Sequence, residues 1–320
     1  MQKIYLLLII GLFLTACNDG DDAVDNNESN ETPVSVIDIN ETYLTGQYIS
    51  YHIYDDGYYK AGVPRRYIKY ADSVRELTKG VSWQDDAAIS ERSYTQDEAA
   101  LYCYDLELNG FDDWRLPTLE ESFELIDYGK ANPALSNSFT NNATGYFWTQ
   151  TPCPVCNEKA FAIAEANGVF YSQEQTNEFH VRCVRGYEIP KNNFVRDDSL
   201  EVVIDKNKNL MWQDGNVEGM ETKVTFSDAL DYCANLVFAG YDDWRIPNVI
   251  ELRLTFDFSG EGNDGLLNVN FQQRLINSWS STTDAQDVTD AWSIEYYLGV
   301  SLPTGKEKFL QKRCVRSIVE

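Results

Sequence analysis

The stretch that decides the fold is Gly110-Phe111-Asp112-Asp113-Trp114-Arg115-Leu116-Pro117, because the chain repeats it as Gly240-Tyr241-Asp242-Asp243-Trp244-Arg245-Ile246-Pro247. Three further motifs recur in the same order: Trp83-Gln84-Asp85 as Trp212-Gln213-Asp214, Tyr102-Cys103 as Tyr232-Cys233, and Arg182-Cys183-Val184-Arg185 as Arg313-Cys314-Val315-Arg316. The spacing between equivalent cysteines barely drifts, from 130 residues for the first to 131 for the second. Because solenoid repeats have periods of roughly 20–50 residues, this repeat predicts duplication of a whole domain.

The N-terminus predicts an exported protein. Lys3 precedes an apolar run from Ile4 to Leu14, which is shorter than the roughly 20 residues that span a bilayer and is typical of a signal peptide. The segment ends Leu14-Thr15-Ala16-Cys17, which resembles the lipobox of bacterial lipoproteins. The resemblance implies cleavage after residue 16 and lipidation of Cys17. The alternative is an ordinary secretory signal that happens to contain a cysteine.

Residues 17–40 are expected to form a tether, because the stretch 18–32 reads NDGDDAVDNNESNET and has too little apolar surface to offset its ordering entropy. Two domains, 41–188 and 189–320, are expected to follow. The acidic stretch also resembles surface-export signals of some outer-membrane lipoproteins, although a solvated linker would contain the same residues. We therefore expect the cell envelope, with the protein held at the outer membrane through its lipid and surface display as one alternative.

The charge balance excludes some partners. The formal net charge is −25 and the sequence pI is about 4.3. This charge argues against binding to nucleic acid, and against binding to sulfated or anionic polymers unless a local basic patch exists. No second long apolar segment follows the first, so we expect no further membrane span.

Seven cysteines are present, and Cys17 is assigned to lipid. The remaining six, an even number in an exported chain, predict disulfides, and count alone would allow about 15 pairings. Because the cysteines recur with the repeat, the economical pairing is Cys103–Cys183 and Cys233–Cys314, each worth about 4 kcal/mol in the chain-entropy model. Cys153 and Cys156 have no counterparts in the second copy, so we expect them to pair with each other.

The order of local patterns predicts an α+β fold. Helices are expected to begin after Thr95 and Thr118 in the first copy and after Thr225 and Asn248 in the second, on capping and spacing patterns. Short strands are expected to follow in the first copy at 146–149, 160–164, 169–172 and 181–185, and in the second at 278–281, 291–295, 300–302 and 312–317. One disulfide per copy would join the first helix to the last strand.

Taken together, these motifs resemble the Lcl C-terminal domain family, over roughly residues 60–187 and 190–318. The resemblance implies two tandem domains with a C-type-lectin-like fold, related to that of formylglycine-generating enzymes, and it implies surface adhesion or glycan binding. Two features depart from the adhesin that gives the family its name. The collagen-like stalk is absent, and the acidic composition does not suit a sulfated polysaccharide, so that ligand is not carried over.

The recurring charged and aromatic residues have a structural interpretation that we favour over a functional one. Asp and Arg side chains beside a buried Trp can fix a strand-to-helix turn by charge-assisted hydrogen bonds. The residues assigned to this scaffold are Trp83, Asp112, Asp113, Trp114, Arg115, Pro117, Arg182, Arg185, Trp212, Asp242, Asp243, Trp244, Arg245, Pro247, Arg313 and Arg316. A calcium site at Asp112 or Asp113 is the alternative, because hard cations bind clustered carboxylates; no other cofactor is expected.

Other residues that could be taken for catalytic, metal-binding or redox groups are also better explained by structural roles. Glu121 and Glu251 each fall at the third position of a helix, where Glu caps the backbone. The two histidines, His52 and His180, do not recur, which excludes a His-based triad or zinc centre present in both copies. Residues 153–156 have redox-motif spacing, but two prolines place them in a loop.

We predict a non-enzymatic binding or adhesion module for a glycan, a matrix protein or an envelope protein. The alternatives are an enzyme of the formylglycine-generating type, which would need free cysteines near the C-terminus, and a purely structural envelope component. Paired Cys183 and Cys314 would argue against the enzyme. Ligand contacts are expected in the loops 129–145 and 259–277, where the two copies differ.

Overall fold

The computed structural model describes residues 42–188, 192–215, 219, 222–259 and 266–318. The expected signal peptide 1–16 and tether 17–40, with Cys17, lie outside the described residues. Within the described ranges, none of the helices has the length and apolar character needed to cross a bilayer. The fold mixes helix and sheet, with many strands and a few short helices.

Each copy builds a four-stranded antiparallel sheet that its last strand completes. In the first copy the order is β1-β2-β3-β7, with β1 at Tyr67–Lys69, β2 at Ser73–Glu76, β3 at Val81–Gln84 and β7 at Val184–Gly186. In the second the order is β14-β10-β9-β8, with β8 at Phe194–Asp197, β9 at Val202–Asp205, β10 at Leu210–Gln213 and β14 at Val315–Ser317. The strands before the helices are missing from the expected pattern, because strands of only three or four residues are too short to show a readable hydrophobic period.

The four expected helices begin directly after their capping residues. They are α3 at Gln96–Tyr104 and α4 at Leu119–Leu125 in the first copy, and α5 at Phe226–Ala234 and α6 at Val249–Leu254 in the second. A short helix, α2 at Ala88–Glu91, lies outside the expected pattern, and its N-cap residue Ala87 makes no side-chain hydrogen bond. A further short helix, α1 at Asp56–Tyr59, precedes the first copy. The Glu121 amide donates to the Thr118 hydroxyl (3.1 Å), and the Glu251 amide donates to the Asn248 side chain (2.9 Å). Both glutamates therefore occupy the expected capping position.

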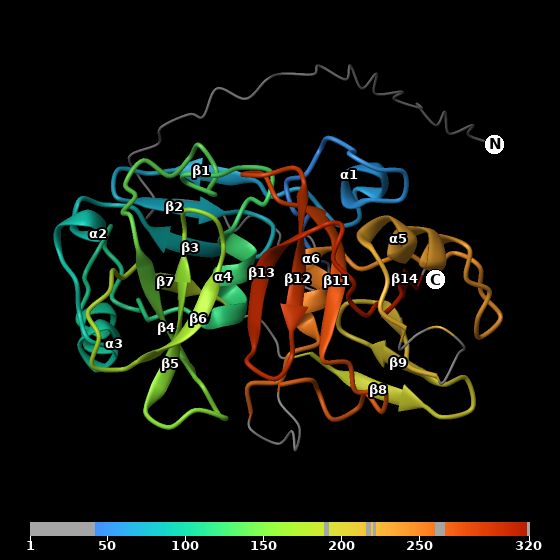
Figure 1. The fold of residues 1–320 in the computed structure, drawn as a ribbon. Helices are drawn as coiled ribbons and strands as arrows, with labels where there is room; N and C mark the ends of the chain where they lie inside the picture. The colour runs from blue at the N-terminus through green and yellow to red at the C-terminus, as the bar shows by residue number, and fades with distance from the viewer. Residues whose placement is uncertain (1–41, 189–191, 216–218, 220–221, 260–265, 319–320) are drawn as a thin grey trace, which may run out of the picture.

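The two strand meanders merge into one six-stranded antiparallel sheet (Figure 1). Its order is β11-β12-β13-β6-β5-β4, with β4 at Tyr146–Pro152, β5 at Lys159–Ala164, β6 at Phe170–Glu174, β11 at Asn277–Thr283, β12 at Asp290–Glu295 and β13 at Val300–Gly305. The junction is a pairing of Ser301 in β13 with Phe170 in β6. The copies are thus two halves of one sheet, a union that the tandem repeat did not reveal.

Both copies also contribute to one apolar core. Helices α4 and α6 contact each other and pack on this sheet, where Phe161 and Ile163 of β5 and Trp292 and Ile294 of β12 enter the same cluster. A smaller core surrounds the disulfide of each copy. The central core therefore belongs to the pair of copies and to neither alone.

A buried arginine lies in this shared core. Arg253 of α6 is 2% exposed, and its Nη2 donates to the Gly168 carbonyl of the other copy (3.1 Å). Rings from both copies surround its guanidinium at 4.6–5.2 Å from their centroids: Phe123, Tyr128, Phe170 and Trp292. Within the described ranges its Nε and Nη1 have no hydrogen-bond partner, and no carboxylate offsets the burial of its charge. Burial lowers the pKa of Arg253 well below its ordinary value.

Replacing Arg253 by an apolar side chain of similar length tests what this residue contributes. Arg253→Met should leave the free energy of unfolding within about 1 kcal/mol of wild type or raise it, because a buried unpaired charge costs desolvation energy. Arg253→Ala should lower it by about 2–5 kcal/mol by leaving a cavity between the copies. Urea unfolding followed by tryptophan fluorescence measures both. A Met variant as unstable as the Ala variant would contradict this account.

Candidate functional site

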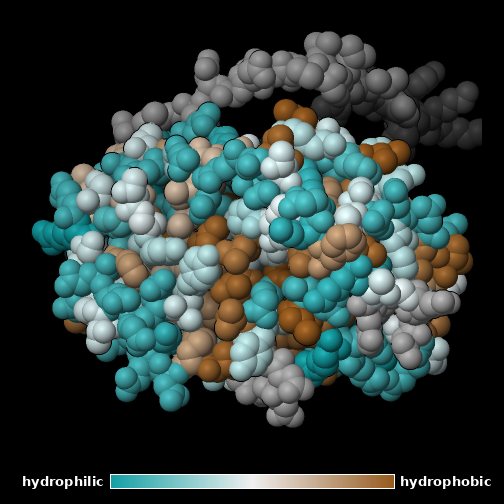
Figure 2. Space-filling model, viewed as in Figure 1, coloured by the Kyte–Doolittle hydropathy of each residue, from teal (hydrophilic) through white to brown (hydrophobic). Residues whose placement is uncertain are grey.

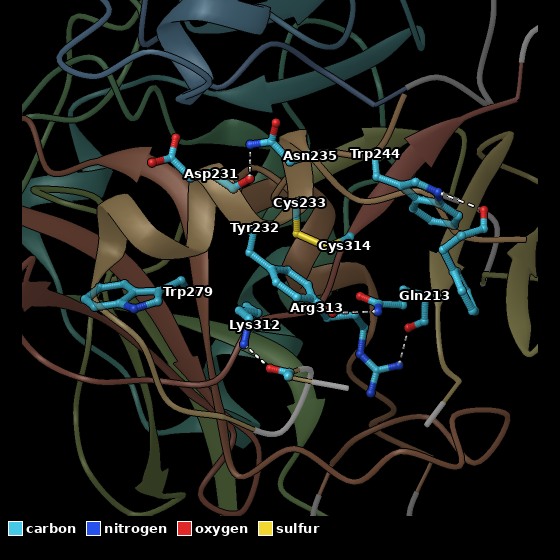
Figure 3. Close-up of a disulfide and its surroundings, with 12 residues drawn as sticks. Gln213, Asp231, Tyr232, Cys233, Asn235, Trp244, Trp279, Lys312, Arg313 and Cys314 are labelled. Atoms are coloured by element: carbon cyan, nitrogen blue, oxygen red, sulfur yellow. Dashed lines mark hydrogen bonds between the residues drawn. A yellow bond between two sulfur atoms is a disulfide. The ribbon is translucent and has the colours of Figure 1, made fainter. Parts of the chain in front are cut away.

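The recurring tryptophan lies beside the disulfide in both copies. Trp114 is 2% exposed and shares a core with Cys103–Cys183, and Trp244 is 1% exposed and shares one with Cys233–Cys314. Each indole donates to a backbone carbonyl six residues earlier, Leu108 (3.4 Å) and Phe238 (3.1 Å). Figure 3 shows this arrangement in the second copy, with Trp244 near the sulfur–sulfur bond. The motif tryptophan fills the core.

The motif arginine binds the helix-capping glutamate. Arg115 donates two hydrogen bonds to Glu121, at 2.7 and 2.6 Å, and Glu121 also accepts from the Thr118 amide (2.8 Å). Arg245 and Glu251 repeat this geometry with two bonds of 2.6 Å. A bidentate pair of this kind fixes two planes relative to each other, so it sets the angle at which the chain enters α4 and α6.

The aspartate of Trp83-Gln84-Asp85 is the centre of a buried network. Asp85 is fully buried and accepts from Lys69 of β1, from Arg182 Nη1 (3.2 Å) and from the backbone amides of Thr140 (2.9 Å) and Asn141 (3.0 Å). One carboxylate therefore joins the first sheet, the segment before the last strand and the loop after α4.

The second copy repeats the network with different partners. Asp214 is fully buried and accepts from Arg196 of β8, from Arg313 Nη1 (2.5 Å) and from the amides of Gln272 (2.7 Å) and Gln273 (3.1 Å). In Figure 3, Arg313 extends from the residue before Cys314 toward Gln213, whose carbonyl accepts from it (3.1 Å). Asp85 and Asp214 were not singled out from the sequence, although both end a recurring motif.

The last recurring arginine of each copy binds the second aspartate of the turn motif. Arg185 binds Asp113 (2.6 Å) and stacks over the Phe111 ring at 3.5 Å. Arg316 binds Asp243 (2.6 Å) and stacks over the equivalent ring of Tyr241 at 3.8 Å. The hydrogen bond from Arg316 lowers the pKa of the Asp243 carboxyl. Asp112 and Asp242, the first aspartates of the two motifs, are exposed.

The remaining candidate residues are also placed by the structure. Cys153 and Cys156 form a disulfide with each other. His180 bridges to Phe147 of β4, and Gln311 bridges to Ser278 of β11 in the same way, so the histidine position does not recur as a histidine. Within the part of the chain that is described, no group of three or more His, Cys, Asp or Glu side chains is arranged to hold a metal ion.

The loop 129–145 does not present an aromatic surface. Its ring, Phe139, is 5% exposed and lies in the shared core, and its backbone is tied to Asp85 as above. The second predicted loop, 259–277, is described only in part. In its described part, Val269 and Ile276 are 44% and 59% exposed. Other large exposed apolar side chains are spread over the surface, and five of them gather in the segment that precedes the first family match.

Five side chains between residues 48 and 58 form what we call the apolar platform: Tyr48, Ile49, Tyr51, Ile53 and Tyr58, which are 45–64% exposed. α1 lies at the upper edge of the molecule in Figure 1, and hydrophobic side chains stand at the same edge in Figure 2. No equivalent segment precedes the second copy in the repeat.

One buried carboxylate holds the platform. Asp55 is fully buried, and its Oδ2 accepts from the amides of Tyr51 (2.8 Å) and His52 (3.2 Å), while its Oδ1 accepts from the Tyr58 amide (2.9 Å). Gly57 lies directly under the loop, because a Cβ there would meet the Ile49 carbonyl oxygen at 2.1 Å. The hydrogen bonds of Asp55 and the close packing of Gly57 therefore hold the backbone that carries the exposed side chains.

The platform is fastened to the second copy. Asp56 accepts from the hydroxyls of Thr45 (2.5 Å) and Thr282 of β11 (2.7 Å), and Gln47 accepts from the Thr283 amide (2.7 Å). Residues 42–63 therefore run from the first copy across to the second, as a strap. Burial raises the pKa of Asp56 to about 7.

Comparison with known protein families now identifies the class of protein that this fold and these motifs define. The family model of the Lcl C-terminal domain matches residues 72–185 and 201–316. These two matches cover more than half of the chain, so the protein belongs to the Lcl C-terminal domain family and carries two copies of that domain. A search of curated proteins found no match.

Removing the charge of Asp85 tests the buried network. Asp85→Asn and Asp214→Asn should each lower the free energy of unfolding by about 3–5 kcal/mol, because each removes a buried carboxylate that binds two cations and two backbone amides. Arg182 would keep its ion pair with Glu165, and Arg196 would keep its ion pair with Asp198. Asp112→Asn and Asp242→Asn, at exposed positions, are the matched controls and should change it by less than about 0.5 kcal/mol. Urea titration measures all four. Equal effects in the two pairs would refute the network as the stabilising element.

The raised pKa of Asp56 predicts a pH dependence of stability. Its pKa is about 7 in the folded chain and about 4 in an unfolded one, so the folded state binds more protons between those values. The free energy of unfolding should therefore fall as pH rises from about 4 to about 7. Asp56→Asn should remove this part of the dependence and be more stable than wild type at pH 8. Parallel pH profiles of the two proteins would contradict the assignment.

Proposed function

We propose that this protein is a lipid-anchored, non-enzymatic binding module of the cell envelope. Its two copies have a C-type-lectin-like fold, and they present a contact surface to a glycan, a matrix protein or an envelope protein at the outer membrane. The lipobox-like Cys17 supplies the anchor and the acidic stretch that follows it supplies the tether.

The observation that carries this proposal is that the polar residues of the recurring motifs bind other residues of the same fold. The arginines pair with Glu121, Glu251, Asp113 and Asp243, and the buried aspartates bind the remaining cations. Recurring polar groups that stabilise turns and cores are typical of a scaffold, and specificity then depends on segments that differ between the copies.

The cysteines favour binding over the enzyme alternative. Chemistry of the formylglycine-generating type would need free thiols near the C-terminus, and Cys183 and Cys314 are each joined to a helix cysteine in a disulfide. Both disulfides are fully buried. Titration of the folded, non-lipidated chain 18–320 should find no reactive thiol, whereas two would revive the enzyme.

Binding is tested on the same chain 18–320, screened against glycan arrays, matrix proteins and envelope extracts with and without calcium. We expect saturable binding to at least one class, which unfolding in urea with a reductant abolishes. Mass spectrometry of the native protein should show an acylated N-terminal Cys17. A chain without acylation, or one that binds nothing in every screen, would overturn the proposal.

A further inference from the structure

The apolar platform differs from the rest of the surface in its charge. From residue 48 to residue 59 the exposed side chains are Ser50 and the five of the platform, and the two carboxylates of the segment, Asp55 and Asp56, are buried. The whole chain is 24% charged and carries a net charge of −25. A stretch with no exposed charge, made of tyrosine and isoleucine, marks a contact surface.

We infer that the apolar platform contacts the surface of the zwitterionic lipid bilayer to which the protein is tethered, and so orients the two copies on the membrane. The inference rests on the proposed function in one respect, the lipid anchor at Cys17. It goes beyond that function because it assigns a partner to a surface that lies outside both family matches, which begin at residue 72.

The position of the platform along the chain favours a membrane as its partner. Thr42, the first residue that the structure describes, follows Cys17 by 25 residues and precedes Tyr48 by six. A random-coil tether of that length would have a root-mean-square span of about 25–30 Å. Among the described residues, the platform is therefore the exposed apolar surface nearest in sequence to the anchor, and a tether of this span would keep it close to the bilayer.

The residue types suit the interface between headgroups and acyl chains. Tyrosine is enriched there because its ring is apolar and its hydroxyl remains hydrated. Ile49 and Ile53, 64% and 52% exposed, supply side chains that gain most from leaving water. Because Asp55 and Gly57 fix the backbone beneath them, these side chains lose little further entropy on contact.

The charges around the platform favour a neutral lipid surface over an anionic one. Lys60 is exposed just beyond the platform, and Lys306 of the second copy lies over the Tyr51 ring at 5.6 Å. Burial lowers the pKa of Lys306, and the nearby carboxylates of Asp55, Asp290 and Asp287 oppose that shift. With carboxylates at its edge and an acidic protein behind it, the platform suits a neutral, zwitterionic surface better than an anionic one.

Quenching by brominated lipid measures the contact directly. The seven native tryptophans are all buried, at 4% exposure or less, so a new exposed tryptophan adds a distinct signal. Ile49→Trp, in the lipidated protein reconstituted into vesicles of phosphatidylcholine, should be quenched by a brominated acyl chain. Tyr104→Trp is the matched control: Tyr104 is 76% exposed on α3, far from α1 in Figure 1, and should not be quenched.

A second measurement does not depend on the anchor. The chain 18–320 should float with phosphatidylcholine vesicles, and the triple variant Tyr48→Ser, Ile49→Ser, Ile53→Ser should bind them at least about tenfold more weakly. Replacing part of the phosphatidylcholine by phosphatidylglycerol should weaken the binding of the wild-type chain at low salt, where charge repulsion is least screened. The urea midpoint of the triple variant should match wild type, because its changed side chains are exposed.

The outcomes separate this inference from the proposed function. Absence of acylation at Cys17 would refute the anchor, while flotation of the chain 18–320 would still support the platform. Equal quenching of Ile49→Trp and Tyr104→Trp, or flotation unchanged in the triple variant, would overturn the inference. Loss of glycan or protein binding in the triple variant, without quenching of Ile49→Trp, would also overturn it and make the platform the ligand site.

Discussion

The buried aspartate that ends each Trp-Gln-Asp motif is the interaction on which the rest of each copy depends. Asp85 and Asp214 are fully buried, and each neutralises a cation from the first sheet and an arginine next to the C-terminal cysteine. Each also binds two amides of the loop after the second helix. Removing the carboxylate would leave one cation (Lys69 or Arg313) without a carboxylate and two amides without their acceptor, while Arg182 and Arg196 would keep Glu165 and Asp198. The fold and this group are therefore specified together.

The two copies make the same two contacts with different residues, and the comparison shows which chemical groups the fold requires. The cation from the first sheet is Lys69 in one copy and Arg196 in the other, and the ring beneath the last arginine is Phe111 or Tyr241. The positive charge and the aromatic ring are retained while the side chain that supplies each one changes. The shared core is different in kind, because Arg253 takes the place that Phe123 holds in the other copy and is enclosed by rings in place of a carboxylate.

Local patterns carried much of the fold in advance. The helix starts at Thr118 and Asn248 and the capping glutamates depend on residues three or four positions apart. The strand meanders depend on short local runs, and the repeat itself paired the cysteines. The network at Asp85 could not be read in this way, since its partners lie 55 and 97 residues away. The junction of the meanders has one register pair, Ser301 with Phe170, which leaves no periodic trace in the sequence. The strap and its platform lie outside the repeat, so no second copy existed to draw attention to them.

The two long disulfides have a mechanical meaning for a protein held at its N-terminus. A load between a tethered end and a ligand would be carried by covalent crosslinks whose cysteines are 80 and 81 residues apart in sequence. The chain inside those two loops cannot extend under load while the disulfides are intact. At about 3.4 Å per residue, the loops together contain roughly 500 Å of contour length that cannot be pulled out. Under tension from the N-terminus the strap from residue 42 to residue 63 would bear the load first, because it precedes both disulfide loops. Its hydrogen bonds to Thr282 and Thr283, the burial of Tyr43 in the shared core and the packing of Tyr54 on the second copy would resist its release. Release of this segment would lengthen the protein while both disulfide loops stayed closed.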